Sequence, residues 1–296
     1  MGSTADVGLI RYLIFILVVV GLSCSGSATV AANQLLVSSD QTGNWEIYSL
    51  SLDSSLVFQM TRDPGHDTDS AWSPDGGSMV LASSRFGDFE LFIVDNEGST
   101  VSQLTDNEFT DGQPAWSPDG EHIAFKSDRT GDVEIFVMRS DGTQVTQLTD
   151  NPGEDWNPSW SPDGTSLAFA SNRNGNGNWD IYTMNSDGTQ VTQLTDNPGE
   201  DWNPSWSPDG TSLAFASNRN GNGNWDIYTM NSDGTQVTQL TDNPSSDLEP
   251  VWSPDGARLA FTSNRNGVLE VFLIDISGRT VTATSQAGIP SDWRLG

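Results

Sequence analysis

The pentapeptide WSPDG recurs along the chain, and its spacing limits what the chain can fold into. Copies begin at Trp72, Trp116, Trp160, Trp206 and Trp252, at intervals of 44, 44, 46 and 46 residues. A period near 45 residues is typical of propeller blades or of helical solenoid units. Each interval contains four short runs of strand-forming residues separated by turn residues, and no run is long enough for an ordinary helix. We therefore expect each interval to form one four-stranded antiparallel blade.

The strand types predict six blades. The second, third and fourth strands of the repeat each occur six times, whereas WSPDG marks the first strand only five times. The chain therefore starts inside a blade, and the segment PSDWRLG (290–296) supplies the missing strand through Trp293. We predict an all-β, six-bladed propeller over residues 33–296, with the C-terminal strand joining the N-terminal blade. Such closure removes an exposed sheet edge.

The first 32 residues indicate export. Arg11 precedes an apolar run from Tyr12 to Leu22, and small residues follow. This order is typical of a secretory signal peptide, and the run is too short to span a bilayer comfortably. We predict a signal peptide over residues 1–32, cleaved near Ala28 or Ala32. The mature chain is then periplasmic or extracellular, without an integral membrane domain.

Cys24, the only cysteine, lies at the end of the apolar run. A lipid anchor at Cys24 is the alternative to plain cleavage. Lipoprotein signals place leucine where this chain has Gly21, so we favour cleavage.

The charge balance limits the partners. Asp and Glu number 40 against 12 Lys and Arg, which gives a formal net charge of −28. Such an acidic surface repels phosphate backbones, so we expect no nucleic-acid partner. The same charge favours cations, basic proteins or a saline medium.

The full repeat pattern, PxWSPDGxxLAFxSxRxGxxxIYxMxxDGxxxxxLT, resembles the repeats of the TolB C-terminal domain. It is also similar to the WD-repeat-like propellers in front of the catalytic domain of prolyl-oligopeptidase-type peptidases. The resemblance covers residues 33–296 and implies a propeller alone. TolB has an additional N-terminal α/β domain that this sequence leaves no room for, and the nucleophile motif G-x-S-x-G is absent. Peptidase activity and the full TolB role are therefore not implied.

Acids recur on one face of the predicted ring. Turns alternate between the two ends of a blade, so SPDG and SDGT lie on one face. The longer loops SNRNGNGNWD and LTDNPGEDWNP lie on the other, here called the loop face, where binding residues are expected. Each inter-blade loop has an acid shortly before the inner strand, which predicts a ring at the channel mouth consisting of Asp67, Asp111, Asp155, Asp201, Asp247 and Asp292.

The acid ring has two interpretations. It could be a carboxylate-lined mouth for a cation, a basic loop or a polar ligand. Alternatively, its members pair with the arginines that end the second strands, and we favour this because repeat-periodic charge is usually scaffold. Blade 1 has Gln41 at the arginine position, which would leave one acid without a local partner. The arginines are Arg85, Arg129, Arg173, Arg219 and Arg265.

Trp156 and Trp202 are loop-face residues present only in the two copies of one duplicated unit, since residues 140–198 and 186–244 are identical. Other blades have Thr68, Gly112 and Leu248 at this position. An exposed tryptophan beside acids suits a peptide or sugar partner. The alternative is that both tryptophans shield the base of the loop.

Signals for catalysis and metal binding are few. His66 and His122 are the only histidines, which precludes a three-histidine zinc site, and we assign no catalytic residue. The loop NRNGNGNWD offers Asn172, Asn174, Asn176 and Asp180 as candidate calcium ligands. Most of their oxygens are neutral amides and the EF-hand spacing fails, so a polar hairpin is favoured.

Three functions are compatible with these observations. We favour an exported, monomeric, non-enzymatic binding module with a protein or peptide at the loop face and channel mouth. This is similar to how the TolB propeller engages a periplasmic lipoprotein. The second is a carbohydrate-active or metal-dependent, lyase-like enzyme, since some related propellers resemble oligogalacturonate lyases. The third is an acidic envelope or surface structural protein.

Overall fold

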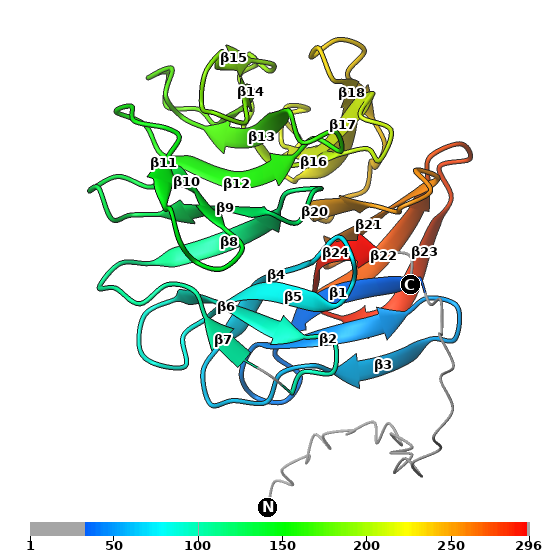
Figure 1. The fold of residues 1–296 in the computed structure, drawn as a ribbon. Helices are drawn as coiled ribbons and strands as arrows, with labels where there is room; N and C mark the ends of the chain where they lie inside the picture. Colours follow the sequence, from blue (N-terminus) through cyan, green and yellow to red (C-terminus); the bar gives the residue numbers. More distant parts are fainter. Residues whose placement is uncertain (1–32, 100, 295–296) are drawn as a thin grey trace, which may run out of the picture. The chain divides into compact units, whose positions relative to one another are not determined.

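The computed structural model describes residues 33–99 and 101–294, which form 24 β-strands and no helix. The strands group into six four-stranded antiparallel sheets arranged as the blades of a ring (Figure 1). The predicted six-bladed propeller is therefore confirmed. The signal peptide and Cys24 lie outside the described residues, so the predicted boundary at residue 32 stays a prediction.

The first three blades contain twelve strands. Blade 1 combines β24 with β1, β2 and β3, blade 2 contains β4 to β7, and blade 3 contains β8 to β11. The strands are β1 (Gln34–Ser39), β2 (Glu46–Ser51), β3 (Leu56–Gln59), β4 (Asp67–Trp72), β5 (Ser78–Ser83), β6 (Glu90–Asp95), β7 (Val101–Gln103), β8 (Asp111–Trp116), β9 (His122–Ser127), β10 (Glu134–Arg139), β11 (Thr146–Gln147) and β24 (Ile289–Arg294).

The remaining blades repeat the same order, from an inner strand beside the channel to a short outer strand. Blade 4 contains β12 to β15, blade 5 contains β16 to β19, and blade 6 contains β20 to β23. The strands are β12 (Asp155–Trp160), β13 (Ser166–Ser171), β14 (Asp180–Asn185), β15 (Thr192–Gln193), β16 (Asp201–Trp206), β17 (Ser212–Ser217), β18 (Asp226–Asn231), β19 (Thr238–Gln239), β20 (Asp247–Trp252), β21 (Arg258–Ser263), β22 (Glu270–Asp275) and β23 (Val281–Ala287).

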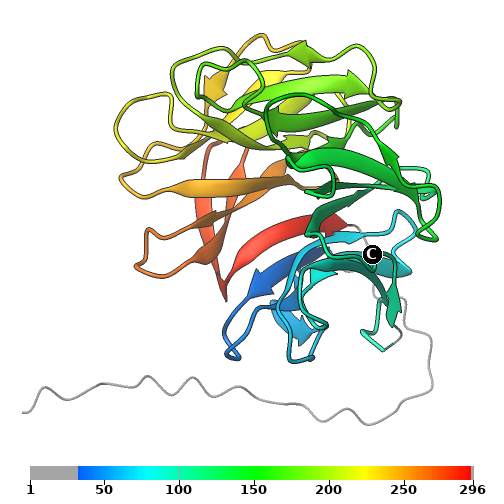
Figure 2. The same ribbon diagram turned by 90° about the vertical axis from the view of Figure 1, so that its left-hand side faces the viewer.

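The last strand closes the ring as predicted. β24, red in Figure 2, pairs antiparallel with β1, in blue. In this pairing Trp293 lies opposite Leu35. The Trp293 indole is 5% exposed and packs in a cluster with Leu35, Val37 and Ala260. Its Nε1 donates a hydrogen bond of 2.5 Å to Oδ1 of Asn33. The two ends of the propeller therefore share one sheet and one hydrophobic cluster.

The hydrophobic core lies between neighbouring blades. One cluster joins Ala168 and Ala170 of β13 to Leu213 and Phe215 of β17, and similar clusters join other neighbouring blades. The second strands are buried on both faces, which explains sequences such as LAFAS with no polar alternation. The phenylalanine of this strand, such as Phe215, is fully buried. This packing fixes the inner strands around the central channel.

Candidate functional site at the channel and loop face

Five of the predicted ring acids form buried ion pairs. Their side chains are 0% exposed, and each pairs with the arginine after the second strand of its own blade. The pairing that we favoured from the sequence is thus present at all five positions, while a partner-binding role for these acids stays a prediction. The pairs and their N–O distances are Arg85–Asp67 (3.3 Å), Arg129–Asp111 (2.8 Å), Arg173–Asp155 (2.7 Å), Arg219–Asp201 (2.8 Å) and Arg265–Asp247 (2.9 Å).

Asp292 does not belong to this ring, and its predicted place there is wrong. Each ring acid stands five residues before the inner-strand tryptophan, whereas Asp292 directly precedes Trp293. The equivalent position in blade 1 is Gly288, where a side chain would collide with the carbonyl oxygen of Ser38. Asp292 instead accepts hydrogen bonds from the backbone N–H groups of Trp72 (2.6 Å) and Trp293 (2.7 Å). Blade 1 therefore lacks both the acid and the arginine.

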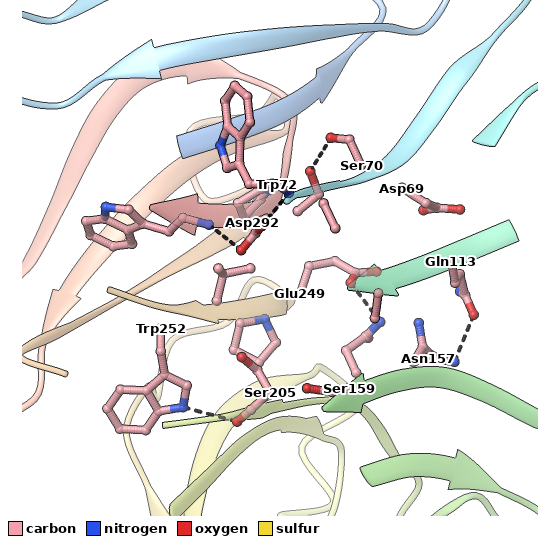
Figure 3. Close-up of a pocket in the computed structure, with 18 of the residues that line it drawn as sticks. Asp69, Ser70, Trp72, Gln113, Asn157, Ser159, Ser205, Glu249, Trp252 and Asp292 are labelled. Atoms are coloured by element: carbon pink, nitrogen blue, oxygen red, sulfur yellow. Dashed lines mark hydrogen bonds between the residues drawn. The ribbon is translucent and has the colours of Figure 1, made fainter. Parts of the chain in front are cut away.

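The central channel is lined by a different set of polar residues. A cavity of about 720 Å³ runs between the inner strands, and Asp69, Gln113, Asn157, Asn203 and Glu249 contribute to its lining (Figure 3). Each stands two residues after a ring acid. Each has a positive φ between 51° and 55°, beside a shift in the inner-strand register. Such a bulge redirects a side chain, here into the channel.

Two of these five channel residues are acids. Oε2 of Glu249 accepts a hydrogen bond of 2.7 Å from Nδ2 of Asn203. The channel walls replace bulk water around Glu249 and raise its pKa to about 8, and the charge of Asp69 adds to this rise. The same loss of water raises the pKa of Asp69, while Lys126 opposes the rise. Four of the five inner strands share the pattern D-x-[polar]-P, and blade 2 has DTDS instead, so the sequence marks a recurrent polar position without indicating that it faces the channel.

Lys126, the only lysine, lies beside the channel residues. Its Nζ is 3.4 Å from the ring centroid of Trp156, a cation–π contact between blades 3 and 4. Gly112 leaves room for this side chain, because a Cβ there would lie 3.3 Å from Cε of Lys126 and 3.8 Å from Oδ2 of Asp69. Lys126 is thus placed between an aromatic face and a channel acid.

The two loop tryptophans form one aromatic cluster with Trp179, which precedes β14. The Trp179 and Trp202 ring centroids are 4.1 Å apart, and Trp156 meets both rings edge-on at 6.1–6.2 Å. Trp156 and Trp202 are both only partly exposed. These contacts agree with shielding of the loop base, and recognition of a partner by the remaining exposed surface stays a prediction.

The candidate calcium loop uses its oxygens internally. Asn174 donates from Nδ2 to Oδ2 of Asp180 at 2.7 Å, and its Oδ1 accepts from the N–H of Asn176 at 3.1 Å. Oδ1 of Asn176 accepts from the N–H of Asn178, and Oδ1 of Asn172 accepts from the N–H of Glu154, both at 2.8 Å. These bonds are those of a polar hairpin, and calcium binding stays an untested prediction.

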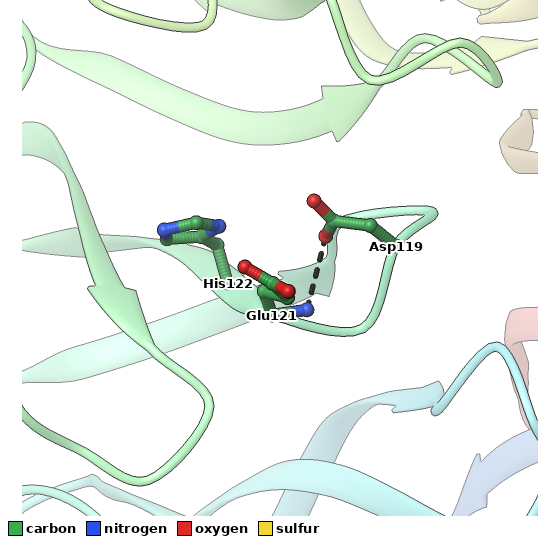
Figure 4. Close-up of side chains that lie close together, drawn as sticks. All are labelled: Asp119, Glu121 and His122. Carbon is green, nitrogen blue, oxygen red and sulfur yellow. Dashed lines mark hydrogen bonds between the residues drawn. The ribbon is translucent and has the colours of Figure 1, made fainter.

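Two other clusters bring three potential metal ligands together among the described residues. Asp119, Glu121 and His122 gather at the SPDG turn of blade 3 (Figure 4), where Oδ1 of Asp119 accepts from the N–H of Glu121 at 2.9 Å. The other cluster consists of Glu46, Asp63 and Asp67 between blades 1 and 2. The sequence did not reveal either cluster. Glu46 is far from Asp63 and Asp67 along the chain, and Glu121 and His122 are not part of the repeat pattern.

The Glu46–Asp63–Asp67 cluster departs from a pattern at the other blade junctions. Four junctions place an asparagine four residues before the ring acid, and its Nδ2 donates to that acid at 2.6–2.8 Å. Asp63 replaces this asparagine between blades 1 and 2. Arg85 is then shared, with N–O distances of 2.8 Å to Asp63 and 3.3 Å to Asp67. This junction has one more carboxylate and one fewer amide donor.

The described residues contain no helix long and apolar enough to cross a membrane.

Comparisons with known proteins agree with the propeller fold. A family model described as the TolB beta propeller domain matches residues 102–177 and 220–291, together half of the chain. No curated protein matches the sequence.

Solved structures with the same fold include TolB from Acinetobacter baumannii, at 20% identity and a TM-score of 0.74. It covers 88% of this chain, and the chain spans 65% of its length. A TolB candidate from Agrobacterium tumefaciens has 24% identity, a TM-score of 0.72, and coverage of 88% and 92% of the two chains. An oligogalacturonate lyase from Vibrio parahaemolyticus has 16% identity, a TM-score of 0.61, and coverage of 85% and 74%. These structural likenesses concern the fold.

Proposed function

Because the chain belongs to the family of TolB beta propeller domains, we propose that it is an exported, non-enzymatic binding module. Its partner is a protein or peptide held at the channel mouth on the loop face. A cell-envelope lipoprotein is one such partner, in keeping with the TolB resemblance. The leader-like order of residues 1–32 supports a periplasmic or extracellular location.

The channel is the observation that carries this proposal. Its volume of about 720 Å³ falls within the range of ordinary ligand pockets. Polar side chains from five inner strands line this one cavity, held in a backbone conformation that glutamate and glutamine seldom adopt. Residues kept in such conformations cluster at functional sites. By contrast, each of the five ring acids is already paired with an arginine of its own blade.

The lyase-like alternative has less support. The neighbouring lyase structures are only 16–17% identical to this chain, and one is described in complex with manganese. Neither His66 nor His122 is among the residues that line the channel. The two clusters of potential metal ligands, at Asp119 and at Asp67, contribute no residue to the lining of the channel.

A capture experiment tests the proposal. The full chain, expressed with its leader and tagged at its C-terminus, is recovered with bound proteins from cell-envelope extract. The W156A/W202A double variant tests the loop face. F58A serves as the control, because Phe58 is 52% exposed on the outer strand of blade 1.

We expect one or a few proteins to be retained by the wild type and by F58A and to be depleted from W156A/W202A. If no protein is enriched over an unrelated bait, the binding-module proposal is refuted. Equal recovery with all three baits would exclude the tryptophan cluster as part of the site. The thermal unfolding of each bait confirms that the variants are folded.

A further inference from the structure

The charges around the channel are not balanced. Asp69 and Glu249 are separate members of the polar lining, and Asn203 supplies a neutral donor to Glu249. No arginine or lysine is among the residues that line the cavity. Lys126 approaches Asp69 from behind Gly112, with its ammonium held on the face of Trp156. The cavity lining therefore contains three acids, Asp69, Glu249 and Asp292. Asp292 already accepts hydrogen bonds from two backbone N–H groups, and Lys126 lies beside Asp69.

The arginines near the loop face cannot supply the missing charge. Each of the five at the ends of the second strands is engaged by a buried acid at 3.3 Å or less. Arg294, at the other end of the inner strands, lies over the Trp72 ring and donates to Gln34 and to the backbone of Gly76. An enclosed carboxylate without a counter-charge is costly, and this cost is what raises the pKa of Glu249. A cation from outside the chain would offset the cost and favour the ionised form.

We propose that the channel receives a cationic group of the partner, a lysine, arginine or N-terminal ammonium, between Asp69 and Glu249. This inference rests on the proposed function and gives the chemistry of the segment that enters. An ammonium or guanidinium supplies several N–H donors, which match two carboxylates and the amide oxygens of the lining. The net charge of −28 attracts a basic segment from a distance, and the two acids of the channel then bind its cationic group.

The geometry of the lining also explains why a single basic side chain is selected. The lining between Asp69 and Glu249 contains three amides, Gln113, Asn157 and Asn203. The sixth inner strand, β24, contributes residues 289–293, with Pro290 at the position that the five polar residues occupy in the other blades. Proline has no side-chain charge or donor, and Oε1 of Gln113 already accepts from the N–H of Asn157 at 2.8 Å. Asp69 and Glu249 are therefore the two strong acceptors among the five bulge residues, while the third lining acid, Asp292, already accepts two backbone N–H groups. A neutral segment has no comparable group to offer Asp69 and Glu249.

A displayed library of random seven-residue peptides provides the probe. The library is selected against the full chain, and the best peptide is synthesised with each Lys or Arg kept or replaced by Gln. Dissociation constants are measured in 0.1 M salt for the wild type, for D69N/E249Q and for D187N/D233N. Asp187 and Asp233 lie in exposed turns on the opposite face and bond only to Thr189 and Thr235 there. The two double variants change the formal net charge equally. The difference between their dissociation constants therefore reports the contribution of the channel acids.

We expect selected peptides to contain a basic residue whose replacement by Gln weakens binding about ten-fold or more, the usual size for a lost charge-assisted bond. D69N/E249Q should show a similar loss, and D187N/D233N less than about two-fold at this salt. Tight peptides that bind D69N/E249Q as well as the wild type would overturn the inference and leave the proposed function standing. Failure to select any peptide also overturns the inference of a cationic group. It counts against the proposed binding function only if the capture experiment fails as well. Unfolding curves establish that D69N/E249Q is folded.

Discussion

The junction between blades 1 and 2 should be stabilised by the substitution D63N. The substitution introduces the asparagine that four of the other five junctions use to bridge their acids. Arg85 would no longer be divided between two carboxylates and could approach Asp67 as closely as the other arginines approach their acids. The reciprocal change, N107D, should introduce the same defect between blades 2 and 3, where Nδ2 of Asn107 donates to Asp111 and Glu90.

The size of the effect follows from Asp67. Burial raises the pKa of Asp67 from 3.8 to about 7, and the neighbouring Asp63 contributes to the rise. A pKa rise of about three units is equivalent to about 4 kcal/mol. Burial is the larger cause and persists in D63N, so we expect the variant to recover about 1–2 kcal/mol at pH 8. For a chain of this size that corresponds to about 3–6 °C in Tm.

The pH dependence gives a second readout. A carboxyl whose folded-state pKa is raised binds more protons in the folded protein than in the unfolded chain between pH 3.8 and about 7. Its contribution to stability is therefore greatest below pH 4 and decreases as the pH rises towards 7. Wild type should lose stability more steeply than D63N over this range, and the difference between them should shrink below pH 5.

Urea unfolding at pH 4.5 and pH 8 measures both effects. The experiment is run in EDTA, so that no bound cation compensates for the extra carboxylate. N107D should be less stable than the wild type at pH 8 by a similar amount. The reasoning is refuted if D63N is no more stable than the wild type at pH 8, or if its advantage is the same at both pH values.

Three further predictions concern closure, calcium and salt. Deleting residues 290–296 should lower Tm strongly, and W293A alone should cost about 3–5 kcal/mol in urea unfolding, because Trp293 is buried against β1; an unchanged melting temperature would contradict closure by β24. Calorimetric titration with calcium should give no saturable heat, because the oxygens of residues 172–180 bind their own hairpin; heat together with a Tm increase would establish a site. Tm should rise between 0.1 and 1 M sodium chloride, since salt screens the repulsion within a chain of net charge −28, and a Tm indifferent to salt would contradict this and weaken the structural-protein alternative.

The sequence was sufficient to predict the fold because the repeat is regular. The segment PSDWRLG predicted the closing strand because Trp293 follows a Pro-Ser start. Trp160 and Trp206 follow the same Pro-Ser pair in the inner strands of blades 4 and 5. The same segment led to an error for Asp292, since closeness to the inner strand was taken as membership in the acid ring. Counting back from the tryptophan would have placed Gly288 there. The register relative to a buried anchor is therefore a better guide than the presence of an acid.

The channel lining could not be predicted by strand alternation. A regular strand puts residues two apart on the same face, which would give Asp155 and Asn157 the same surroundings. The register shift between Trp156 and Ser159, with the positive φ of Asn157, separates them instead. Asp155 is fully buried against Arg173, whereas Asn157 contributes to the channel lining. No residue type in the motif specifies such a bulge, since Asp, Gln, Asn and Glu all occupy the position.

The position of β24 has a consequence for synthesis of the chain. The strand that covers β1 is separated from it by five complete blades, and it is the last part of the propeller to be made. Blade 1 therefore has an unpaired inner edge until β24 has been made, and a chain that stops before β24 retains it. Free edges promote association with other strands, so β24 decides whether a newly made propeller is a closed ring or an aggregation-prone fragment. A cell that degrades chains with open edges would thereby remove unfinished copies and spare complete ones.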